Sequence, residues 1–507
     1  MAAAILMPLV AGGANVQQLF HYQSTITSDH AGPLDLRAEI HYDDTRSSAP
    51  IAVVMHGYSP ASGNFGNVSA NAQRLRDAGF FVISVAMRGR DGSDGVRDSG
   101  GLEVYDIYDA VEAVKAAHSD RVDPTNVHIT GYSGGGGNVM SALTKFPDYF
   151  RAGSSFFGMS DYGYDQQAGW YCAGAASNHQ SQLRTDIGNP ALGDPYVEDR
   201  YHARASSLAA RTNPYSEIHL FVNIDEVTCP PSHITRYRDH ADAAASAEGE
   251  FDNIHVHIAP VRALYEDFNG NGINEPNERQ WWPHGFPNAN QQAAGEGWYF
   301  SRLLDGSIPE PVLNNSDDLF VAGFVKTRQF EFWIGDGQNG AGLLEYSLGE
   351  THKSFALSIE SNNLEIGTQL TLETGDMQGQ KVDVLLNSEF IESITLGAEY
   401  QTDQLRHGDS LLLRLATPGD YDKNGVVDFN DYVAWKNAFG STELLMADGN
   451  GDGVVDAADF TIWRNHFETT SPGAIVHSVA AIPEPSWQTA GSVLAIAALL
   501  LSPKSRG

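Results

Sequence analysis

The feature that most constrains this chain is an apolar run, residues 127–130, that leads into a G-x-S-x-G turn and then into a helical pattern. A serine on a tight turn from strand to helix is held above the sheet with its hydroxyl exposed. Glycines on either side allow the tight turn and the close start of the helix. The N–H of Gly134, at the helix start, can point at a developing oxyanion. We therefore expect Ser133 to be a nucleophile and Gly134 to be one oxyanion donor.

Strands and helices alternate through residues 35–308. Apolar β-prone runs occupy residues 51–55, 80–87, 127–130, 154–157 and 218–223, and helical patterns occupy residues 67–79, 101–117, 232–247 and 291–304. This order predicts a mostly parallel sheet covered by helices on both faces. Residues 160–215, which are rich in Gly, Asn, Tyr and Trp, interrupt the alternation and are expected to form a cap above the sheet.

A linker at residues 309–317 precedes a region of different character. Short alternating runs follow one another without helical patterns between them, at residues 354–359, 369–373, 381–386 and 410–415. This pattern predicts a small β-sandwich over residues 318–417. The sandwich could bind carbohydrate, or it could be a spacer.

Residues 418–470 contain an internal repeat, in which residues 420–431 recur as residues 448–459. Each copy has oxygen-bearing side chains at loop positions 1, 3, 5, 9 and 12 and glycine at position 6. Calcium needs several hard oxygen ligands, with one backbone carbonyl at position 7, and the turn needs the glycine. Position 12 is Asp rather than the usual Glu. The expected calcium ligands are Asp420, Asp422, Asn424, Val426, Asp428 and Asp431, and then Asp448, Asn450, Asp452, Val454, Asp456 and Asp459.

A third loop, residues 267–278, has the same spacing. Its expected calcium ligands are Asp267, Asn269, Asn271, Ile273, Glu275 and Glu278. Pro276 and Pro283 forbid a regular exiting helix, so we expect an EF-hand-like loop rather than a complete EF-hand. Because the loop lies just before His284, we expect its calcium to order the segment that carries this histidine.

A serine nucleophile needs a base to take its proton and an acid to hold the base. In the α/β-hydrolase fold the three residues follow the order Ser, acid, His. Asp225, just past the strand at 218–223, is the expected acid, and Glu226 is the alternative. His284, which lies between aromatic residues before the last helix, is the expected base. Its competitors among the 18 histidines are His240, His255 and His257.

The second oxyanion donor should come from the loop after the strand at 51–55, which reads His56-Gly57-Tyr58-Ser59. Either the backbone N–H of Tyr58 or its phenol can reach the oxyanion in this arrangement. Each such donor lowers the barrier by roughly 3 kcal/mol. We expect His56 to pack in the turn rather than to act as a base.

Composition and chain ends limit the partners and the compartment. A net charge of −33 argues against nucleic acids and anionic membranes as partners. Cys172 and Cys229 could form one disulfide or remain two thiols, and no Cys/His cluster has zinc spacing. Residues 1–18 resemble a secretory signal, although the basic n-region is missing. Residues 481–507 combine Pro-Glu-Pro, an apolar run that is short for a free-standing span, and a basic tail.

Residues of about 50–305 resemble the catalytic domain of the prolyl oligopeptidase family of serine peptidases. The matching segments are His56-Gly57-Tyr58, Arg88-Gly89 with Asp91-Gly92-Ser93, Asp106 and Asp109, Val122-Asp123-Pro124, residues 131–135 and residues 146–152. The segment around Asp225 departs from the family, because it is one residue longer and lacks the family's glycine. No β-propeller precedes the hydrolase region, so the family's usual size filter for peptides is absent. The resemblance implies the α/β-hydrolase fold and a Ser-His-Asp triad, which esterases share.

Two further resemblances concern the C-terminal part of the chain. The repeat resembles dockerin type I domains, which implies structural calcium and a cohesin-like protein partner. The tail resembles the PEP-CTERM sorting signal, which implies export to the cell surface or the exterior and C-terminal processing. A membrane would then be involved only through this tail, before processing.

Together these features predict an exported serine hydrolase that forms an acyl-enzyme on a peptide or an acylated carbohydrate. A serine peptidase is the first expectation, and an acetyl-xylan or feruloyl type of carbohydrate esterase is the alternative. A non-catalytic surface assembly protein is the rival from another class. We expect structural Ca²⁺ and no organic cofactor.

Overall fold

The computed structural model describes residues 15–26, 33–58, 63–162, 177–212, 215–223, 226, 228–248, 253–259 and 302–467. Several sequence predictions concern residues outside these ranges. They are most of the signal-like segment, Cys172, Asp225, the loop at 267–278, His284 and the tail at 481–507.

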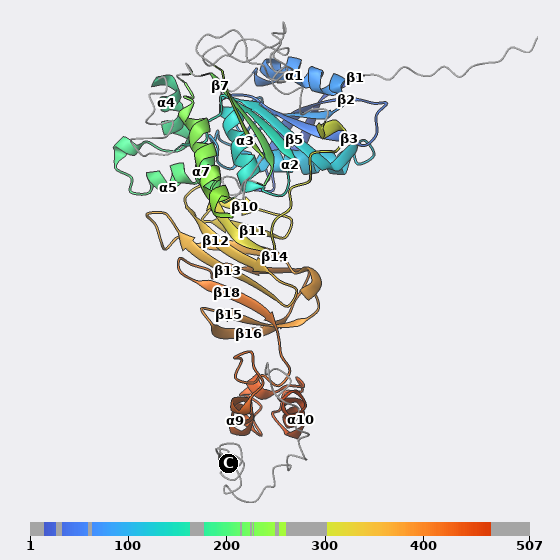
Figure 1. Cartoon of the computed structure of the whole chain (residues 1–507), viewed down its shortest axis with the longest axis vertical. Helices are drawn as coiled ribbons and strands as arrows, with labels where there is room; N and C mark the ends of the chain where they lie inside the picture. Colours follow the sequence, from blue (N-terminus) through green and yellow to red (C-terminus); the bar gives the residue numbers. More distant parts are fainter. Residues whose placement is uncertain are drawn as a thin grey trace, which may run out of the picture. The chain divides into compact units, whose positions relative to one another are not determined.

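The hydrolase region is built around an eight-stranded sheet with the order β1-β2-β4-β3-β5-β6-β7-β8 (Figure 1). β1 pairs antiparallel with β2, β2 pairs antiparallel with β4, and the other neighbours are parallel. β3 is buried at every residue, as expected for a strand covered on both faces. The strands are β1 (Asn15–Gln23), β2 (Asp35–Asp43), β3 (Ala49–Met55), β4 (Phe81–Val85), β5 (Val122–Tyr132), β6 (Ala152–Phe156), β7 (Glu217–Asn223) and β8 (Ile254–Ala259).

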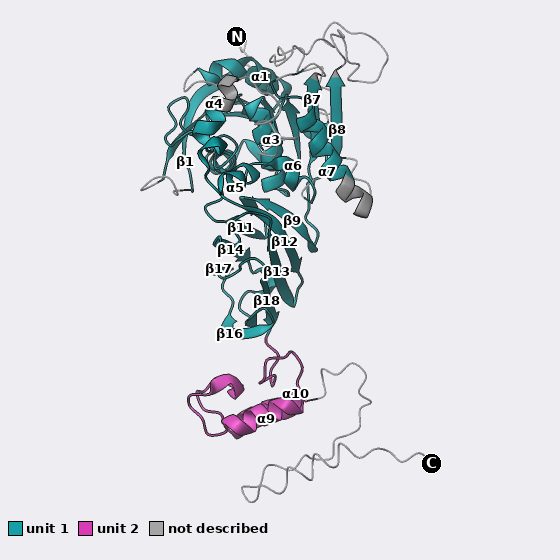
Figure 2. Cartoon of the chain, turned by 90° about the vertical axis from the view of Figure 1, so that its left-hand side faces the viewer, with its two compact units in different colours: residues 1–415 teal, residues 416–507 magenta. Residues whose placement is uncertain are grey.

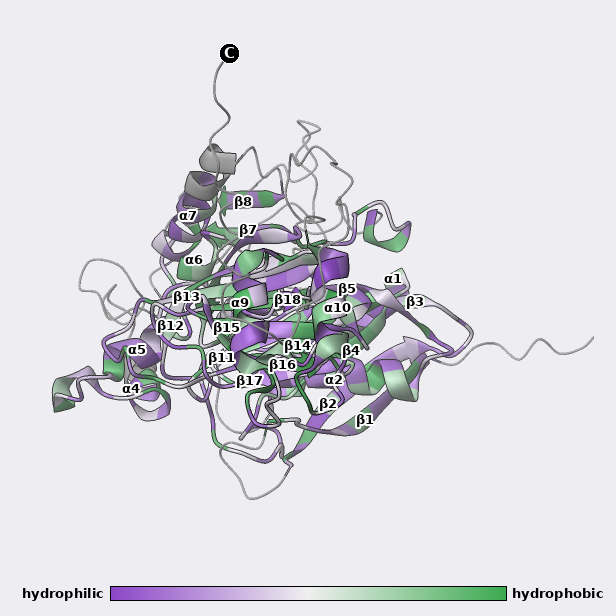
Figure 3. Ribbon diagram, turned by 90° about the horizontal axis from the view of Figure 1, so that it is seen from below, coloured by the Kyte–Doolittle hydropathy of each residue, from purple (hydrophilic) through white to green (hydrophobic). Residues whose placement is uncertain are grey.

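Helices cover this sheet, which confirms the predicted α/β class. α1 (Asn64–Ala78) packs on β3 and β4, α2 (Glu103–Ala117) on β1 and β4, α3 (Gly134–Lys145) on β5 and β6, and α7 (Ser232–Glu248) on β7 and β8. Hydrophilic and hydrophobic residues are mixed along the coloured part of α7, as expected for a helix with one face on a sheet (Figure 3). The region expected to form a cap contains α4 (Ser177–Asp186), η1 (Pro190–Leu192), α5 (Val197–His202) and α6 (Ser206–Ala209).

Three strands of the sheet, β1, β2 and β8, were not predicted from the sequence. β1 is mostly exposed, so its hydropathy carries little signal, and its pairing with β2 holds it in the sheet. β1 begins at Asn15, so the strand overlaps the end of the signal-like segment assigned to residues 1–18. β8 reads IHVHIA, in which the alternating histidines weaken the apolar pattern.

Residues 316–415 form two antiparallel sheets, as predicted for a β-sandwich. One sheet has the order β10-β11-β14-β17 and the other β16-β15-β18-β13-β12-β9, and they share one hydrophobic core. The elements are β9 (Ser316–Ala322), β10 (Phe324–Lys326), β11 (Phe330–Ile334), β12 (Ala341–Leu348), β13 (His352–Ile359), β14 (Thr368–Glu373), η2 (Gly375–Met377), β15 (Lys381–Leu386), β16 (Glu389–Thr395), β17 (Glu399–Thr402) and β18 (Ser410–Leu415).

The sandwich packs directly on the hydrolase region, and residues 1–415 form one compact unit (Figure 2). Lys145, the last residue of α3, is buried and donates hydrogen bonds to the carbonyls of Ala203 and Ala322. Its ammonium group lies 4.3 Å from the ring centroid of Phe324. The Tyr105 hydroxyl in α2 donates to Glu331 of β11 at 2.9 Å. α3 is therefore attached to the sandwich at its C-terminal end.

Residues 416–507 form the second compact unit, and its described part is a two-fold repeat. It contains α9 (Phe429–Ala438), η3 (Leu445–Ala447) and α10 (Ala457–His466). The Trp435 indole donates to the Asp456 carbonyl at 2.7 Å, and the Trp463 indole donates to the Asp428 carbonyl at 2.8 Å. Each half thus binds the helix start of the other half through equivalent tryptophans.

Among the residues that the structure describes, no helix combines the length and the apolar character needed to cross a membrane.

Candidate active site and calcium loops

Ser133 lies on the turn between β5 and α3, as the sequence predicts. Its backbone has φ 52° and ψ −121°, a conformation that residues with a side chain rarely adopt. Hydrogen bonds fix this turn on both sides: the Ser133 N–H donates to Phe156 at 2.8 Å, and the Ser133 carbonyl accepts from Gly137 at 2.9 Å. Strained residues that are held in this way concentrate at active sites.

The glycines around Ser133 are required by close backbone contacts. A Cβ on Gly131 would lie 2.4 Å from the Gly135 carbonyl oxygen, and one on Gly135 would lie 2.4 Å from the His56 carbonyl oxygen. A Cβ on Gly134 would lie 2.2 Å from the Tyr58 ring. The structure therefore brings the predicted oxyanion loop directly against the nucleophile turn.

The phenol of Tyr58 is turned into the protein interior. It donates to the Asn138 amide oxygen at 3.0 Å and lies 2.7 Å from the Tyr162 hydroxyl. Burial raises the pKa of Tyr58 well above its usual value. Of the two groups predicted for this residue, the backbone N–H is therefore the one that we retain as a candidate oxyanion donor. Asn138 and Tyr162 carry no motif and were not predicted.

Buried charges hold this network in place. The Asn138 amide donates to Glu103 at 2.9 Å, and Glu103 pairs with Arg90 at 3.2 Å. Arg88 contacts both carboxylate oxygens of Asp106 at 2.7 Å, and both side chains are fully buried. The R-G and D-x-x-D segments of the sequence thus meet as a buried ion pair.

The loop after β7 reaches Ser133 through Cys229. This cysteine is free and buried, and burial raises the pKa of its thiol, whereas a hydrogen bond with Ser133 opposes the rise. Glu226, the alternative acid, accepts the backbone N–H groups of Thr228 at 2.6 Å and Cys229 at 3.1 Å. Its carboxylate thus stabilises the turn that leads to Cys229. No pattern in the sequence indicates that Cys229 would be a neighbour of Ser133.

The described competitors of His284 are engaged elsewhere. His240 donates to the Ser207 carbonyl at 2.6 Å, and the rings of His255 and His257 stack on residues of β7. His56 donates to the Gly57 carbonyl at 2.8 Å, and burial lowers the pKa of its imidazole to about 4. His56 therefore packs in the turn as a neutral side chain, as expected.

The predicted ligands of the two repeat loops carry oxygen donors and include no imidazole or thiol. In the first loop, carboxylate oxygens of Asp420, Asp422 and Asp431 lie within 4.8 Å of one another. Burial raises the pKa of Asp422, and repulsion from Asp420 adds to the rise. Gathering carboxylates in this way is unfavourable without a cation, so the donor set fits the hard dication predicted from the sequence.

The remaining predicted ligands shape both loops. Asp428 and Asp456 cap α9 and α10, each in a capping box with the position-12 residue, Asp431 or Asp459. The position-1 carboxylates accept the N–H of the position-6 glycine at 2.8 Å, from Gly425 to Asp420 and from Gly453 to Asp448. Side chains at positions 3 and 5 lie together, with Asn424 3.0 Å from Asp422 and Asn450 2.8 Å from Asp452.

Comparisons with known proteins agree with this picture. Residues 66–185 match the prolyl oligopeptidase family, and residues 418–468 match the dockerin type I domain. The chain therefore carries a segment of a serine hydrolase family, which includes the turn at Ser133, and a dockerin type I domain.

Individual relatives are distant. A Pseudomonas putida 2-hydroxy-6-oxononadienedioate/2-hydroxy-6-oxononatrienedioate hydrolase is 29% identical over 114 residues, which are 22% of this chain and 38% of that protein. The Pyrococcus horikoshii acylaminoacyl peptidase structure has a TM-score of 0.41 and 18% identity, and covers 57% of this chain and 42% of that one. A Pyrococcus furiosus esterase has a TM-score of 0.34 and 12% identity, and covers 49% and 84%. The chain thus spans about two fifths of the length of the first two.

Proposed function

We propose that the chain is an exported serine hydrolase that cleaves an acyl bond through an acyl-enzyme, with Ser133, His284 and Asp225 as its triad. The observation that carries this proposal is the strained, hydrogen-bonded turn of Ser133 between β5 and α3. The match of residues 66–185 to the prolyl oligopeptidase family supports it.

The reaction follows the serine hydrolase scheme. The Ser133 hydroxyl attacks the acyl carbonyl carbon while His284 takes its proton, and Asp225 orients the imidazole and stabilises its charged form. The N–H groups of Gly134 and Tyr58 hold the oxyanion. His284 then passes the proton to the leaving amine or alcohol, which departs and leaves an ester on Ser133. Water, deprotonated by His284, attacks this ester and releases the acid.

The first candidate substrate is a peptide, because the family match is to serine peptidases. The second is an acylated carbohydrate. The dockerin type I match supports this candidate, because it is consistent with an esterase associated with polysaccharides. Purified protein should be tested against Xaa-Pro and other peptide amides beside acetylated and feruloylated sugars. Turnover that Ser133→Ala abolishes identifies the class.

A fluorophosphonate probe tests the nucleophile itself. The probe should form one adduct on folded protein, and Ser133→Ala should lose it. Cys229→Ala should keep the adduct, which controls for the neighbouring thiol. An adduct that survives Ser133→Ala, or no adduct on folded wild-type protein, would favour the rival of a non-catalytic assembly protein.

For the dockerin region we propose calcium in both loops and a cohesin-like protein partner. The ion would be held by the oxygen atoms at positions 1, 3, 5, 7, 9 and 12 of each loop, and its chemistry there is structural. Isothermal titration of Ca²⁺ into the calcium-free chain, compared with Asp420→Asn and Asp448→Asn, measures each loop separately.

For the loop at 267–278 we propose a third calcium ion, which orders the segment carrying His284. Glu278→Gln should then lower kcat in Ca²⁺ and abolish any further effect of chelation on kcat. A wild-type kcat that chelation leaves unchanged would contradict this proposal.

A further inference from the structure

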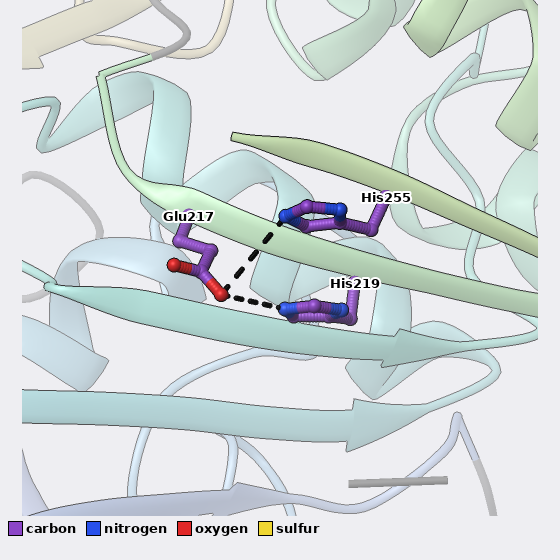
Figure 4. A group of neighbouring side chains, drawn as sticks. All are labelled: Glu217, His219 and His255. Carbon is purple, nitrogen blue, oxygen red and sulfur yellow. Dashed lines mark hydrogen bonds and ion pairs between the residues drawn. The ribbon is translucent and has the colours of Figure 1, made fainter. Parts of the chain in front are cut away.

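A second group of ligating side chains lies at the edge of the hydrolase sheet, on β7 and β8. Glu217 and His219 are two residues apart on β7, so their side chains project from the same face. His255 is the partner of His219 in the parallel register of β8. The three side chains point toward one another in Figure 4.

The spacing of these side chains suits a single small cation. The Glu217 Oε1 lies 3.0 Å from the His219 Nε2 and 4.0 Å from the His255 Nε2. The ligand atoms of all three residues lie within 4.8 Å of one another. Ligands at about 2.0–2.2 Å from a tetrahedral Zn²⁺ are roughly 3.4 Å apart. The rings of His219 and His255 are stacked, with centroids 4.4 Å apart and planes 10° from parallel. The His255 ring must therefore rotate about its side-chain bonds to aim its Nε2 lone pair at an ion that His219 also binds.

The surroundings orient one of the histidines. His219 is fully buried, and its second nitrogen, Nδ1, lies 3.4 Å from the His257 Nε2. Metal-binding histidines commonly use the second nitrogen in this way, which fixes ring orientation and tautomer. When His219 Nδ1–H donates to His257, its Nε2 lone pair points toward Glu217 and is available to a cation.

Access is provided on the other side of the group. The His255 side chain is 33% exposed, whereas that of Glu217 is 9% exposed. Arg302, which is 38% exposed, places its guanidinium 2.9 Å from the Glu217 Oε1. The guanidinium group contacts the carboxylate oxygen that a metal would bind. Because the Arg302 side chain is partly exposed, it can move into solvent when a metal binds. Arg302 is therefore a built-in competitor.

We propose that Glu217, His219 and His255 bind a divalent transition-metal ion of the zinc type, with solvent as the fourth ligand. Two imidazoles and one carboxylate form a donor set that zinc accepts and that calcium, which prefers oxygen, does not. The site is distinct from the oxygen-only loops of the dockerin region.

The place of the site in the sheet assigns it a structural role. Glu217 is the first residue of β7, whereas Ser133 follows the carboxyl end of β5. In a parallel sheet these positions lie at opposite ends of the strands, which are separated by the length of a strand, about 20 Å. The metal would bind the edge strand β8 to β7 and would not touch the substrate.

The test uses the full chain without a polyhistidine tag, in excess Ca²⁺, so that the oxygen-rich loops are filled. Zn²⁺ binding is measured by calorimetry, and Co²⁺ binding by its visible absorption, which is intense only in tetrahedral sites. His255→Asn should weaken Zn²⁺ binding at least 100-fold, about the most that loss of an outer partner costs. The matched control is His21→Asn, which alters an exposed histidine on β1 whose Nδ1 lies 3.1 Å from Asp35. This variant should bind Zn²⁺ as the wild type does.

Arg302→Gln gives a result of opposite sign and does not depend on the stability of His255→Asn. Removing a positive charge next to the ligand oxygen should tighten Zn²⁺ binding about tenfold. Equal Zn²⁺ affinity in wild type and a folded His255→Asn, or no tightening in Arg302→Gln, would overturn the proposal.

Discussion

The backbone of Ser133 stores strain, and the size of that strain can be measured. Ser133→Gly and Ser133→Ala both remove the hydroxyl, but only the glycine variant removes the Cβ that makes φ 52° and ψ −121° unfavourable. A residue in such a conformation costs about 1–3 kcal/mol, and the freedom of glycine in the unfolded chain offsets about 0.4–1 kcal/mol of the gain. We therefore expect Ser133→Gly to be more stable than Ser133→Ala by about 1–2 kcal/mol.

Calorimetry of the full chain is the assay, because the two variants differ only in a shift of one transition, about 2 °C per kcal/mol for a large domain. Ser141, buried in the interior of α3, provides the matched pair. There glycine should be the less stable variant by about 1 kcal/mol. This pair also identifies the transition that contains α3. If Ser133→Gly is no more stable than Ser133→Ala while the Ser141 pair shows the usual order, the turn is not strained.

Three further variants test the surroundings of the site. Gly135→Ala places a Cβ 2.4 Å from the His56 carbonyl oxygen, and should lose fluorophosphonate labelling and about 1–3 kcal/mol of stability; normal labelling would refute the close packing. Arg88→Met leaves the buried Asp106 carboxylate unpaired and should lower the free energy of unfolding by about 3–5 kcal/mol, measured by urea denaturation, with partial recovery in the double variant with Asp106→Leu. Burial lowers the pKa of Lys145 to about 7, whereas its pKa in the unfolded chain is about 10.4. Between these two pH values the unfolded state binds more protons than the folded state. The contribution of Lys145 to the free energy of unfolding therefore rises with pH in this range. Lys145→Met should remove that rise, seen as a flatter dependence of Tm on pH from 7 to 10, and an unchanged slope would contradict the assignment.

The sequence was sufficient where chemistry requires a local pattern. The turn around Ser133 needs glycines at fixed positions, and the calcium-type loops need oxygen ligands at fixed positions, so both could be read from residue order. Strands such as β3 were recognisable because a strand covered on both faces is continuously apolar.

The sequence was insufficient where partners are distant along the chain. Nothing in the residues around Tyr58 indicates that its phenol turns toward Asn138 and Tyr162, because those contacts depend on how the sheet is assembled. Similarly, Glu217, His219 and His255 have no motif spacing, and only the pairing of β7 with β8 brings them together. β1 was missed because an exposed strand has no hydropathy pattern to recognise.

The buried amine of Lys145 has a consequence for how such proteins can be recombined. The amine donates hydrogen bonds to one carbonyl of the hydrolase region and one of the sandwich. While the two regions are packed together, the Lys145 side chain is shielded from solvent. A break within the 309–317 linker would expose this group and the aromatic surface around it, so we expect the hydrolase region and the β-sandwich to be stable only together. The boundary between the two compact units follows Leu415. A dockerin domain could be exchanged at this boundary while the hydrolase region keeps its contacts with the β-sandwich.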